Sequence, residues 1–185
     1  MILLGISILT SNIPSSSMTF AKDSKGRPRP TFKQLLSNPV AFLAFGFGSG
    51  LAPKAPGTAG TVAAIPLFYL FADLPIYTYL GIIAITFALG IYLCEQASKW
   101  LGVHDHGGIV WDEFVGLWIS YIALPAGWPW VVAGFVLFRF FDMLKPWPIS
   151  FIDKHVHGGF GIMIDDVLAG LAALACIQVA AYFWF

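Results

Sequence analysis

The chain has 185 residues, of which 58% are hydrophobic and 11% charged, and its formal net charge is zero. Soluble domains carry about 25% charged residues, and a domain of this size exposes too much surface to hide so many apolar side chains from water. The composition excludes an ordinary soluble domain and indicates a single integral membrane domain.

The N-terminal segment, residues 1–33, is unlike the remainder of the chain. Residues 22–33 contain five of the ten basic side chains and two prolines, so we expect a basic, mobile tail. Residues 1–17 lack the positive flank of a signal peptide, and Met18 is an alternative start. Two hypotheses stay open: these residues are natural, or they come from an over-extended reading frame. Residues 34–185 are expected to form the membrane-embedded domain.

The first apolar stretch, residues 34–47, is too short and too interrupted to span a bilayer. We expect an interfacial or re-entrant helix there, with Asn38 as its cap and Pro39 as its first helical residue. Five longer apolar segments follow, at about 58–72, 75–94, 109–124, 129–144 and 162–184. The sequence therefore predicts an all-α fold, a polytopic membrane helix bundle of about five spanning helices plus the N-terminal interfacial or re-entrant helix.

Basic residues are distributed unevenly between the two ends of these segments. If the basic tail lies in the cytoplasm, the connections at residues 73–74 and 125–128 lie outside and contain no Lys or Arg. Every basic residue then falls on the cytoplasmic side, as the positive-inside rule requires. Because the motifs described next fall on that side as well, we expect a functional site at the cytoplasmic face.

A glycine-rich segment, GSGLAPKAPGTAG, occupies residues 48–60. Backbone N–H groups of such a loop at a helix N-terminus bind anions, and we predict phosphate contacts from it and from Ser49, Lys54 and Thr58. Its spacing is not that of a P-loop, because no GKS or GKT follows. The alternative interpretation is close helix packing through small residues.

The next motif, HDHGG at residues 104–108, leads directly into Asp112 and Glu113. Asp105 and His106 are candidates for a metal ligand or for proton transfer. The alternative is a polar loop that caps the following helix, with its glycines as turn residues.

Acidic side chains in apolar surroundings give the strongest functional signal. Asp112 and Glu113 lie within IVWDEFVGLWI, Asp142 within LFRFFDML, and Asp165 and Asp166 within GIMIDDVLAG. Carboxylates in membrane segments are costly and mark functional sites. Because clustered carboxylate oxygens suit Mg²⁺, we predict that these five acids form a magnesium site and that the first two take part in catalysis.

Two basic residues flank Asp142: Arg139 lies three residues before it and Lys145 three after it. One interpretation is that they bind a phosphate group. The other is that they neutralise Asp142 as ion-pair partners on one helix face. Ion pairing at Asp142 does not cover the two adjacent acid pairs, so it does not replace the metal prediction.

The chain resembles the bacterial phosphatidylglycerophosphatase A family in four strings: GFGSGLAPKAPGTAG, HDHGGIVWDEFVG, FRFFDMLKPWPI and HGGFGIMIDDVLAG. They extend from about Phe45 to Gly170. The resemblance implies a Mg²⁺-dependent phosphoric monoester hydrolase of the bacterial inner membrane, with residues 34–185 as its catalytic domain. It would convert the phospholipid phosphatidylglycerophosphate to phosphatidylglycerol and phosphate, in phospholipid biosynthesis. No nucleic-acid partner is expected, and the sequence leaves the oligomeric state open.

On this interpretation the metal neutralises the terminal phosphate, which is attacked by a water or by a carboxylate. Asp105 or His106 protonates the leaving alkoxide. A function of another class, an intramembrane cation transporter or channel, would use the same acids. A cation pathway needs acids through the whole depth of the bilayer, however, and here we expect them at one end of the spans.

Overall fold

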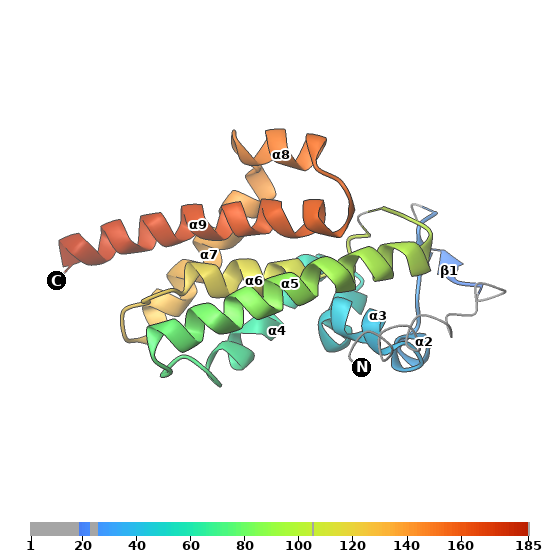
Figure 1. Ribbon diagram of the computed structural model, residues 1–185, viewed down its shortest axis with the longest axis horizontal. Helices are drawn as coiled ribbons and strands as arrows, with labels where there is room; N and C mark the ends of the chain where they lie inside the picture. The colour runs from blue at the N-terminus through green and yellow to red at the C-terminus, as the bar shows by residue number, and fades with distance from the viewer. Residues whose placement is uncertain (1–18, 23–25, 105, 185) are drawn as a thin grey trace, which may run out of the picture.

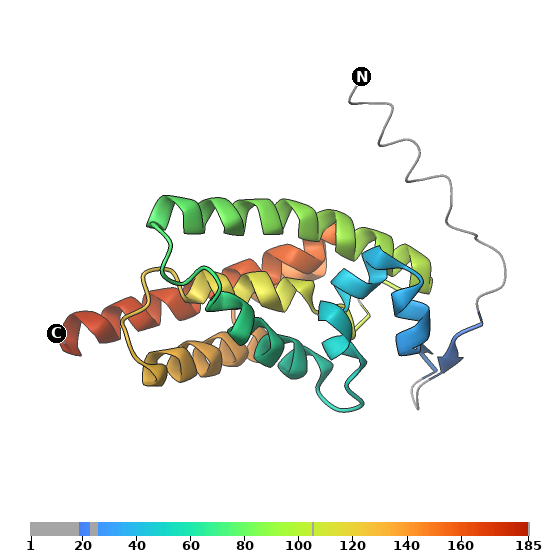
Figure 2. The ribbon, with the colours of Figure 1, turned by 90° about the horizontal axis from the view of Figure 1, so that it is seen from below.

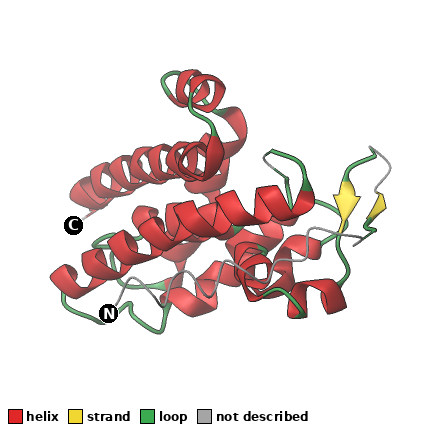
Figure 3. Cartoon of the chain, turned by 45° about the vertical axis from the view of Figure 1, so that its right-hand side comes forward, coloured by secondary structure: helices red, strands yellow, loops and turns green. Residues whose placement is uncertain are grey.

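The computed structural model describes residues 19–22, 26–104 and 106–184. The hypotheses about residues 1–17 and about Asp105 therefore fall outside the described residues. Within these ranges the protein is mostly helical, and its strands are two short ones near the N-terminus (Figure 3).

A two-stranded ribbon and a short helix form the first described part of the chain. Strand β1 (Ala21–Lys22) pairs antiparallel with β2 (Pro28–Arg29). Helix α2 (Phe32–Leu36) follows and begins with a capping box between Thr31 and Gln34. Part of the predicted basic tail is thus regular structure.

Two further short helices cover the stretch predicted as one interfacial or re-entrant helix. In α3 (Pro39–Ala44) the Asn38 side chain accepts a hydrogen bond from the Ala41 N–H at 3.2 Å, so the predicted cap is confirmed. Helices α2 and α3 are separate because Asn38 is extended (φ −130°, ψ 96°), a conformation that a following proline favours. The 3₁₀ helix η1 (Gly46–Leu51) comes next.

Five helices form the main bundle, and each lies on one of the five predicted apolar segments. They are α4 (Pro56–Phe68), α5 (Ile76–Leu101), α6 (Trp111–Ser120), α7 (Trp128–Leu144) and α9 (Gly158–Trp184). The short helix α8 (Ile149–His155) connects α7 to α9 and packs on α9. Figures 1 and 2 show α5, α6 and α9 running lengthwise through the molecule, with α2 and α3 at one end.

Two helices, α5 and α9, are long and apolar enough to cross a membrane. In α5 only 22% of the apolar window is buried inside the protein, unlike the core helix of a soluble protein. Such exposed apolar surface marks a membrane or protein contact, and it suggests membrane association. Helices α4, α6 and α7 have 13, 10 and 17 residues, so by length they do not confirm the predicted number of about five spans.

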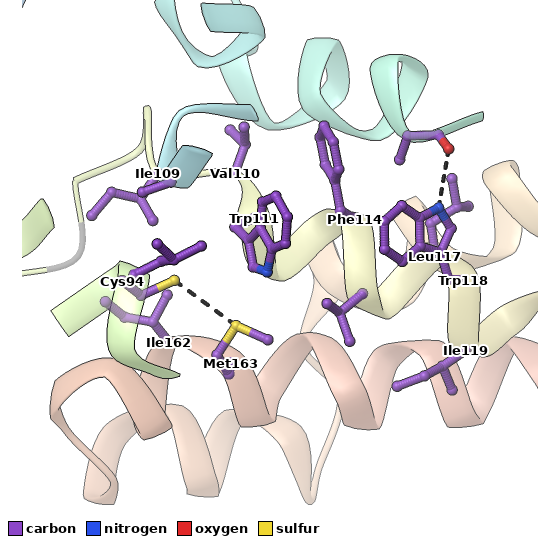
Figure 4. Packing of buried hydrophobic residues seen from close by; sticks show 14 of the residues in the cluster. Cys94, Ile109, Val110, Trp111, Phe114, Leu117, Trp118, Ile119, Ile162 and Met163 are labelled. Atoms are coloured by element: carbon purple, nitrogen blue, oxygen red, sulfur yellow. Dashed lines mark hydrogen bonds between the residues drawn. The ribbon is translucent and has the colours of Figure 1, made fainter. Parts of the chain in front are cut away.

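Helix α6 is the centre of the bundle and contacts α4, α5, α7 and α9. Eight of its ten residues are buried. On one side Trp118 donates its Nε1–H to the carbonyl of Ala64 in α4 at 3.0 Å, and on the other Met163 of α9 meets Cys94 of α5 (Figure 4). This packing holds α6 at the centre of the bundle, and the N-terminal turn of α6 carries the first acid pair.

Candidate active site

The acid pair Asp112 and Glu113 lies in the first turn of α6, where the helix dipole favours negative charge. The loop that leads into this turn is held by the glycine-rich segment. A Cβ added to Gly50 would overlap the carbonyl oxygen of Gly108, so the two backbones pass in direct contact. At this point the glycine-rich segment serves close packing, the alternative interpretation of its sequence.

The second acid pair, Asp165 and Asp166, lies in α9, and both residues are buried. Helix α9 reaches α6 at Gly116, one turn beyond Asp112. A Cβ on Gly116 would lie 2.8 Å from the backbone oxygen of Asp166. Because no side chain separates the helices here, the acids of the two helices approach one another.

Three carboxylates converge at this contact. Oxygens of Asp112, Glu113 and Asp166 all lie within 4.8 Å of one another. Asp166 is 3% exposed, and among the described residues its Oδ2 atom and the Oε2 atom of Glu113 are buried without a hydrogen-bond partner. Three like charges at this distance, one buried and two partly buried, repel one another strongly, so the arrangement favours a bound cation or bound protons.

Arg139 of α7 faces two carboxylates. Its Nη1 atom lies 2.5 Å from Oδ2 of Asp142 and 3.7 Å from Oε1 of Glu113, and all three side chains are largely buried. A Cβ on Gly57, in the first turn of α4, would overlap that same Glu113 oxygen. Arg139 is thus an ion-pair partner of Asp142, as the second interpretation of this motif predicts.

Lys145 joins three elements at the end of α7. Its Nζ atom donates hydrogen bonds to Oδ1 of Asp153 in α8 at 2.7 Å and to Oδ2 of Asp165 in α9 at 2.5 Å. Burial lowers the pKa of the Lys145 ammonium, but the hydrogen bonds to Asp153 and Asp165 outweigh burial and raise this pKa above its ordinary value. Lys145 therefore stays protonated and brings a fixed positive charge beside the acids.

A cavity of about 330 Å³ opens onto these groups. All five acids predicted as metal ligands line it, and so does Lys145. Of the five, Asp112, Glu113 and Asp166 converge, and Asp142 and Asp165 each lie against a cation at 2.5 Å, whereas Glu113 lies 3.7 Å from Arg139. The sequence-based set is thus divided into a three-carboxylate cluster and two ion pairs.

The other predicted phosphate contacts do not line this cavity among the described residues. The Ser49 hydroxyl donates to the carbonyl of Gly46 at 2.8 Å, and Lys54 is exposed. Thr58 is the third residue of α4 and half-buried. Arg139 does not line the cavity and lies instead against the carboxylates of Asp142 and Glu113.

His106, predicted to act on protons or metal, lies on the far side of its loop from the cavity. Its Nδ1 atom accepts the Gly108 N–H at 3.0 Å, so Nε2 carries the hydrogen and donates it to the carbonyl of Pro28 at 2.7 Å. The ring thus connects the N-terminal ribbon to the HDHGG loop.

The cavity also includes residues that sequence reasoning did not identify. Asp153, Lys154 and His157 line it from α8 and the turn that follows, and His104 lines it from the HDHGG loop. His104 also accepts the N–H of Gly158 at 2.9 Å. The sequence offered one signal for Asp153, an acidic residue eight positions after Lys145. Because the chain turns between α7 and α8, helical spacing did not predict that the two side chains meet.

The fold and site define a mostly helical protein with a carboxylate cluster at one end of its bundle, and its two long apolar helices suggest membrane association. The family model of Phosphatidylglycerophosphatase A matches residues 42–181, and the chain belongs to this family. The Escherichia coli (strain K12) protein named Phosphatidylglycerophosphatase A is 53% identical over 150 residues, which is 80% of this chain and 87% of that protein.

A protein of the same name from Haemophilus influenzae is 49% identical over 155 residues, covering 83% of this chain and 95% of its own length. No solved structure matches the chain significantly. The family match includes every acid of the cavity and leaves out the N-terminal ribbon.

Proposed function

We propose that this protein hydrolyses the terminal phosphate monoester of phosphatidylglycerophosphate and releases phosphatidylglycerol and inorganic phosphate. One observation carries the proposal: Asp112, Glu113 and Asp166 converge from two helices at a cavity that also presents Lys145. The names of the two bacterial relatives support this substrate. Neither name supports the transporter alternative, and the acids gather at one end of the bundle.

We further propose that the three-carboxylate cluster binds Mg²⁺. The residues fit this ion because carboxylate oxygens are its preferred protein ligands. In addition, Oε2 of Glu113 and Oδ2 of Asp166 are buried without a hydrogen-bond partner among the described residues, and the two carboxylates belong to one cluster. When bound, Mg²⁺ supplies Lewis acidity, which offsets phosphate charge and makes water a better nucleophile. Asp142 and Asp165, each paired with a cation, would support the cluster from outside.

The residues of the chain have distinct roles in this reaction. Lys145, held by Asp153 and Asp165, places its positive charge where phosphate oxygens gather in the transition state. A water attacks phosphorus, its proton passes to Glu113 or Asp166, and the bond from phosphorus to the glycerol oxygen breaks. Asp105 stays the predicted donor of the proton that this oxygen takes up, whereas His106 does not line the acidic cavity and donates its Nε2–H to the carbonyl of Pro28.

The exposed apolar faces of α5 and α9 support a placement in the bacterial inner membrane. We propose a multi-pass arrangement in which the acid-bearing end of the bundle faces the cytoplasm, because the basic residues of the chain gather at that end. The phosphate head group would then reach the cavity from the interface, while the acyl chains stay in lipid.

Phosphate release tests the reaction. The purified full-length protein in neutral detergent is given phosphatidylglycerophosphate, first with Mg²⁺ and then with excess chelator. The proposal predicts stoichiometric phosphate and phosphatidylglycerol with Mg²⁺, loss of the reaction with chelator, and recovery when Mg²⁺ is restored. Absence of phosphate release from a folded, lipid-supplemented sample overturns the proposed reaction, and release that survives the chelator overturns the magnesium proposal.

A further inference from the structure

The cavity that the five acids line also contains two side chains that the reaction above does not use. Lys154 lines it from the last turn of α8, and His157 lines it from the turn that leads into α9. Both side chains are exposed, whereas Asp165 is 7% and Asp166 3% exposed. Burial therefore orders this cavity by depth: carboxylates lie at its inner end, and Lys154 and His157 lie at its mouth.

Lys154 and His157 differ from the other basic side chains of the cavity because they keep free N–H donors. Lys145 is held by two carboxylates, and the Nε2 atom of His104 accepts a backbone N–H. Among the described residues, no group forms a hydrogen bond or an ion pair with Lys154 or His157. The Lys154 ammonium and the imidazole of His157 can therefore both donate to a ligand at the mouth.

Contacts at both ends hold this part of the chain against the cavity. Asp153, the residue before Lys154, accepts a hydrogen bond from Lys145 at 2.7 Å. The ring of His157 lies edge-on to the ring of His104, with 5.7 Å between the centroids. His104 in turn accepts the N–H of the first residue of α9 at 2.9 Å. The two donors thus belong to the built wall of the cavity.

The chemistry of the substrate matches this order. Phosphatidylglycerophosphate carries a phosphomonoester and a phosphodiester joined by one glycerol unit, and its acyl chains lie beyond the phosphodiester. When the phosphomonoester reaches the inner carboxylates, the phosphodiester therefore lies toward the mouth. At about 30 Å³ of liquid volume per water, the cavity of about 330 Å³ has room for about ten waters, more than one phosphate group needs.

An apolar side chain adjoins the cation at the mouth. Phe151 lies three residues before Lys154 on α8 and is 55% exposed, and residues at this spacing are neighbours on a helix surface. Carboxylates, cation and apolar surface thus correspond to phosphomonoester, phosphodiester and acyl chains.

We propose that Lys154 and His157 bind the phosphodiester of the substrate at the mouth of the cavity, while the carboxylate cluster and Lys145 act on the phosphomonoester. This inference rests on the proposed function. An ammonium binds phosphate oxygens as a compact charge, and an imidazole donates an N–H in either protonation state. The two residues then select phosphomonoester lipids that also carry a phosphodiester.

The test compares single variants of the full-length protein in neutral detergent micelles. Lys154→Ala and His157→Ala each remove one donor. The controls Lys33→Ala and His155→Ala remove exposed side chains of the same types that do not line the cavity. Equal midpoints of thermal unfolding establish that all four variants fold. Phosphate release gives kcat and KM, inhibition by phosphatidylglycerol reports on the phosphodiester, and inhibition by inorganic phosphate reports on the carboxylate end.

Lys154→Ala should raise KM and the inhibition constant of phosphatidylglycerol about three- to tenfold, because a hydrogen bond from a charged group is lost at a partly solvated site. His157→Ala should raise both about threefold. In both variants kcat and the inhibition by inorganic phosphate should stay within about twofold of the unmodified protein. The controls should match the unmodified protein in all four quantities.

Several results would overturn the inference. One is an unchanged KM in both cavity variants, and another is an equal rise in Lys33→Ala, which would show an effect of general charge. Equal weakening of inhibition by inorganic phosphate and by phosphatidylglycerol would assign the two residues to the phosphomonoester. An effect of Lys154→Ala seen only after anionic lipid is added would assign the site to a neighbouring lipid. If the unmodified protein releases no phosphate, the proposed function itself fails, a result distinct from all of these.

Discussion

Gly170 of α9 lies directly on the backbone of Gly116 in α6: a Cβ added to Gly170 would overlap the carbonyl oxygen of Gly116. Each glycine follows an acid of the cluster by four residues, Asp166 in α9 and Asp112 in α6. The two helices therefore run in the same direction and meet one turn beyond the carboxylates. The short distance between helices is what brings acids from two elements within reach of one ion.

Replacing Gly170 by Ala should separate the two helices. Overpacking of this kind costs about 1–3 kcal/mol, and we expect a lower midpoint of thermal unfolding together with phosphate release reduced by at least roughly tenfold. Gly81→Ala is the matched control, because Gly81 also lies in a long helix and has nothing within 4 Å of an added Cβ. Equal effects of the two substitutions would contradict the role given to the helix contact.

Neutralising one acid of the cluster should stabilise the metal-free protein. Asp166→Asn removes one of three like charges that repel one another, so thermal unfolding in chelator should shift upward by a few degrees. Added Mg²⁺ should raise the unfolding midpoint of the unmodified protein, because ligands stabilise the state that binds them, and should leave that of the variant unchanged. The exposed residue Asp73 provides a control through Asp73→Asn. A variant still stabilised by Mg²⁺ to the same degree would show that the ion binds elsewhere.

The ion pairs of Lys145 should contribute unequally to stability. Asp165 has 9% of its side chain exposed and Asp153 has 36%. Lys145→Gln removes the cation of both pairs and leaves the buried Asp165 carboxylate without it, at a cost of about 3 kcal/mol, whereas Asp153→Asn breaks only the more exposed pair, at a cost below about 1 kcal/mol. Thermal unfolding of both variants measures this order, and a larger loss from Asp153→Asn would reverse the assignment.

Cys176 offers a test of the membrane placement. It lies in α9 and is exposed on the bundle surface, whereas Cys94 is buried. If α9 crosses a bilayer, the Cys176 thiol faces lipid, where it does not ionise and so does not react. In vesicles, a chain carrying Cys94→Ala should resist a charged maleimide until it is denatured.

A matched chain that also carries Cys176→Ala and Asp73→Cys should react at once, because Asp73 lies in an exposed connection. Rapid labelling of Cys176 in intact vesicles would argue that α9 does not span the membrane.

Features that depend on neighbouring residues in the sequence were well predicted. The five apolar segments each contain a helix, and the Asn38 cap precedes Pro39 as expected. The acid pairs could be recognised because a carboxylate among apolar residues stands out locally. Their convergence was a prediction about tertiary structure, and it held for Asp112, Glu113 and Asp166.

Features that depend on turns between helices were not predictable in the same way. The chain reverses between Lys145 and Asp153, so no helical periodicity relates the two side chains, and α8 was absent from the expected elements. The sequence allowed Arg139 to bind phosphate or to pair with Asp142, and the structure shows the pair with Asp142 within α7.

The central claim is that the three-carboxylate cluster performs the hydrolysis, and the turnover of Asp166→Asn tests it most directly. Phosphate release from phosphatidylglycerophosphate is measured at saturating Mg²⁺ for the unmodified protein, Asp166→Asn and the control Asp73→Asn. We predict that kcat falls by at least roughly 100-fold in Asp166→Asn and stays within about twofold in Asp73→Asn. A folded Asp166→Asn protein that retains full Mg²⁺-dependent activity would contradict the account.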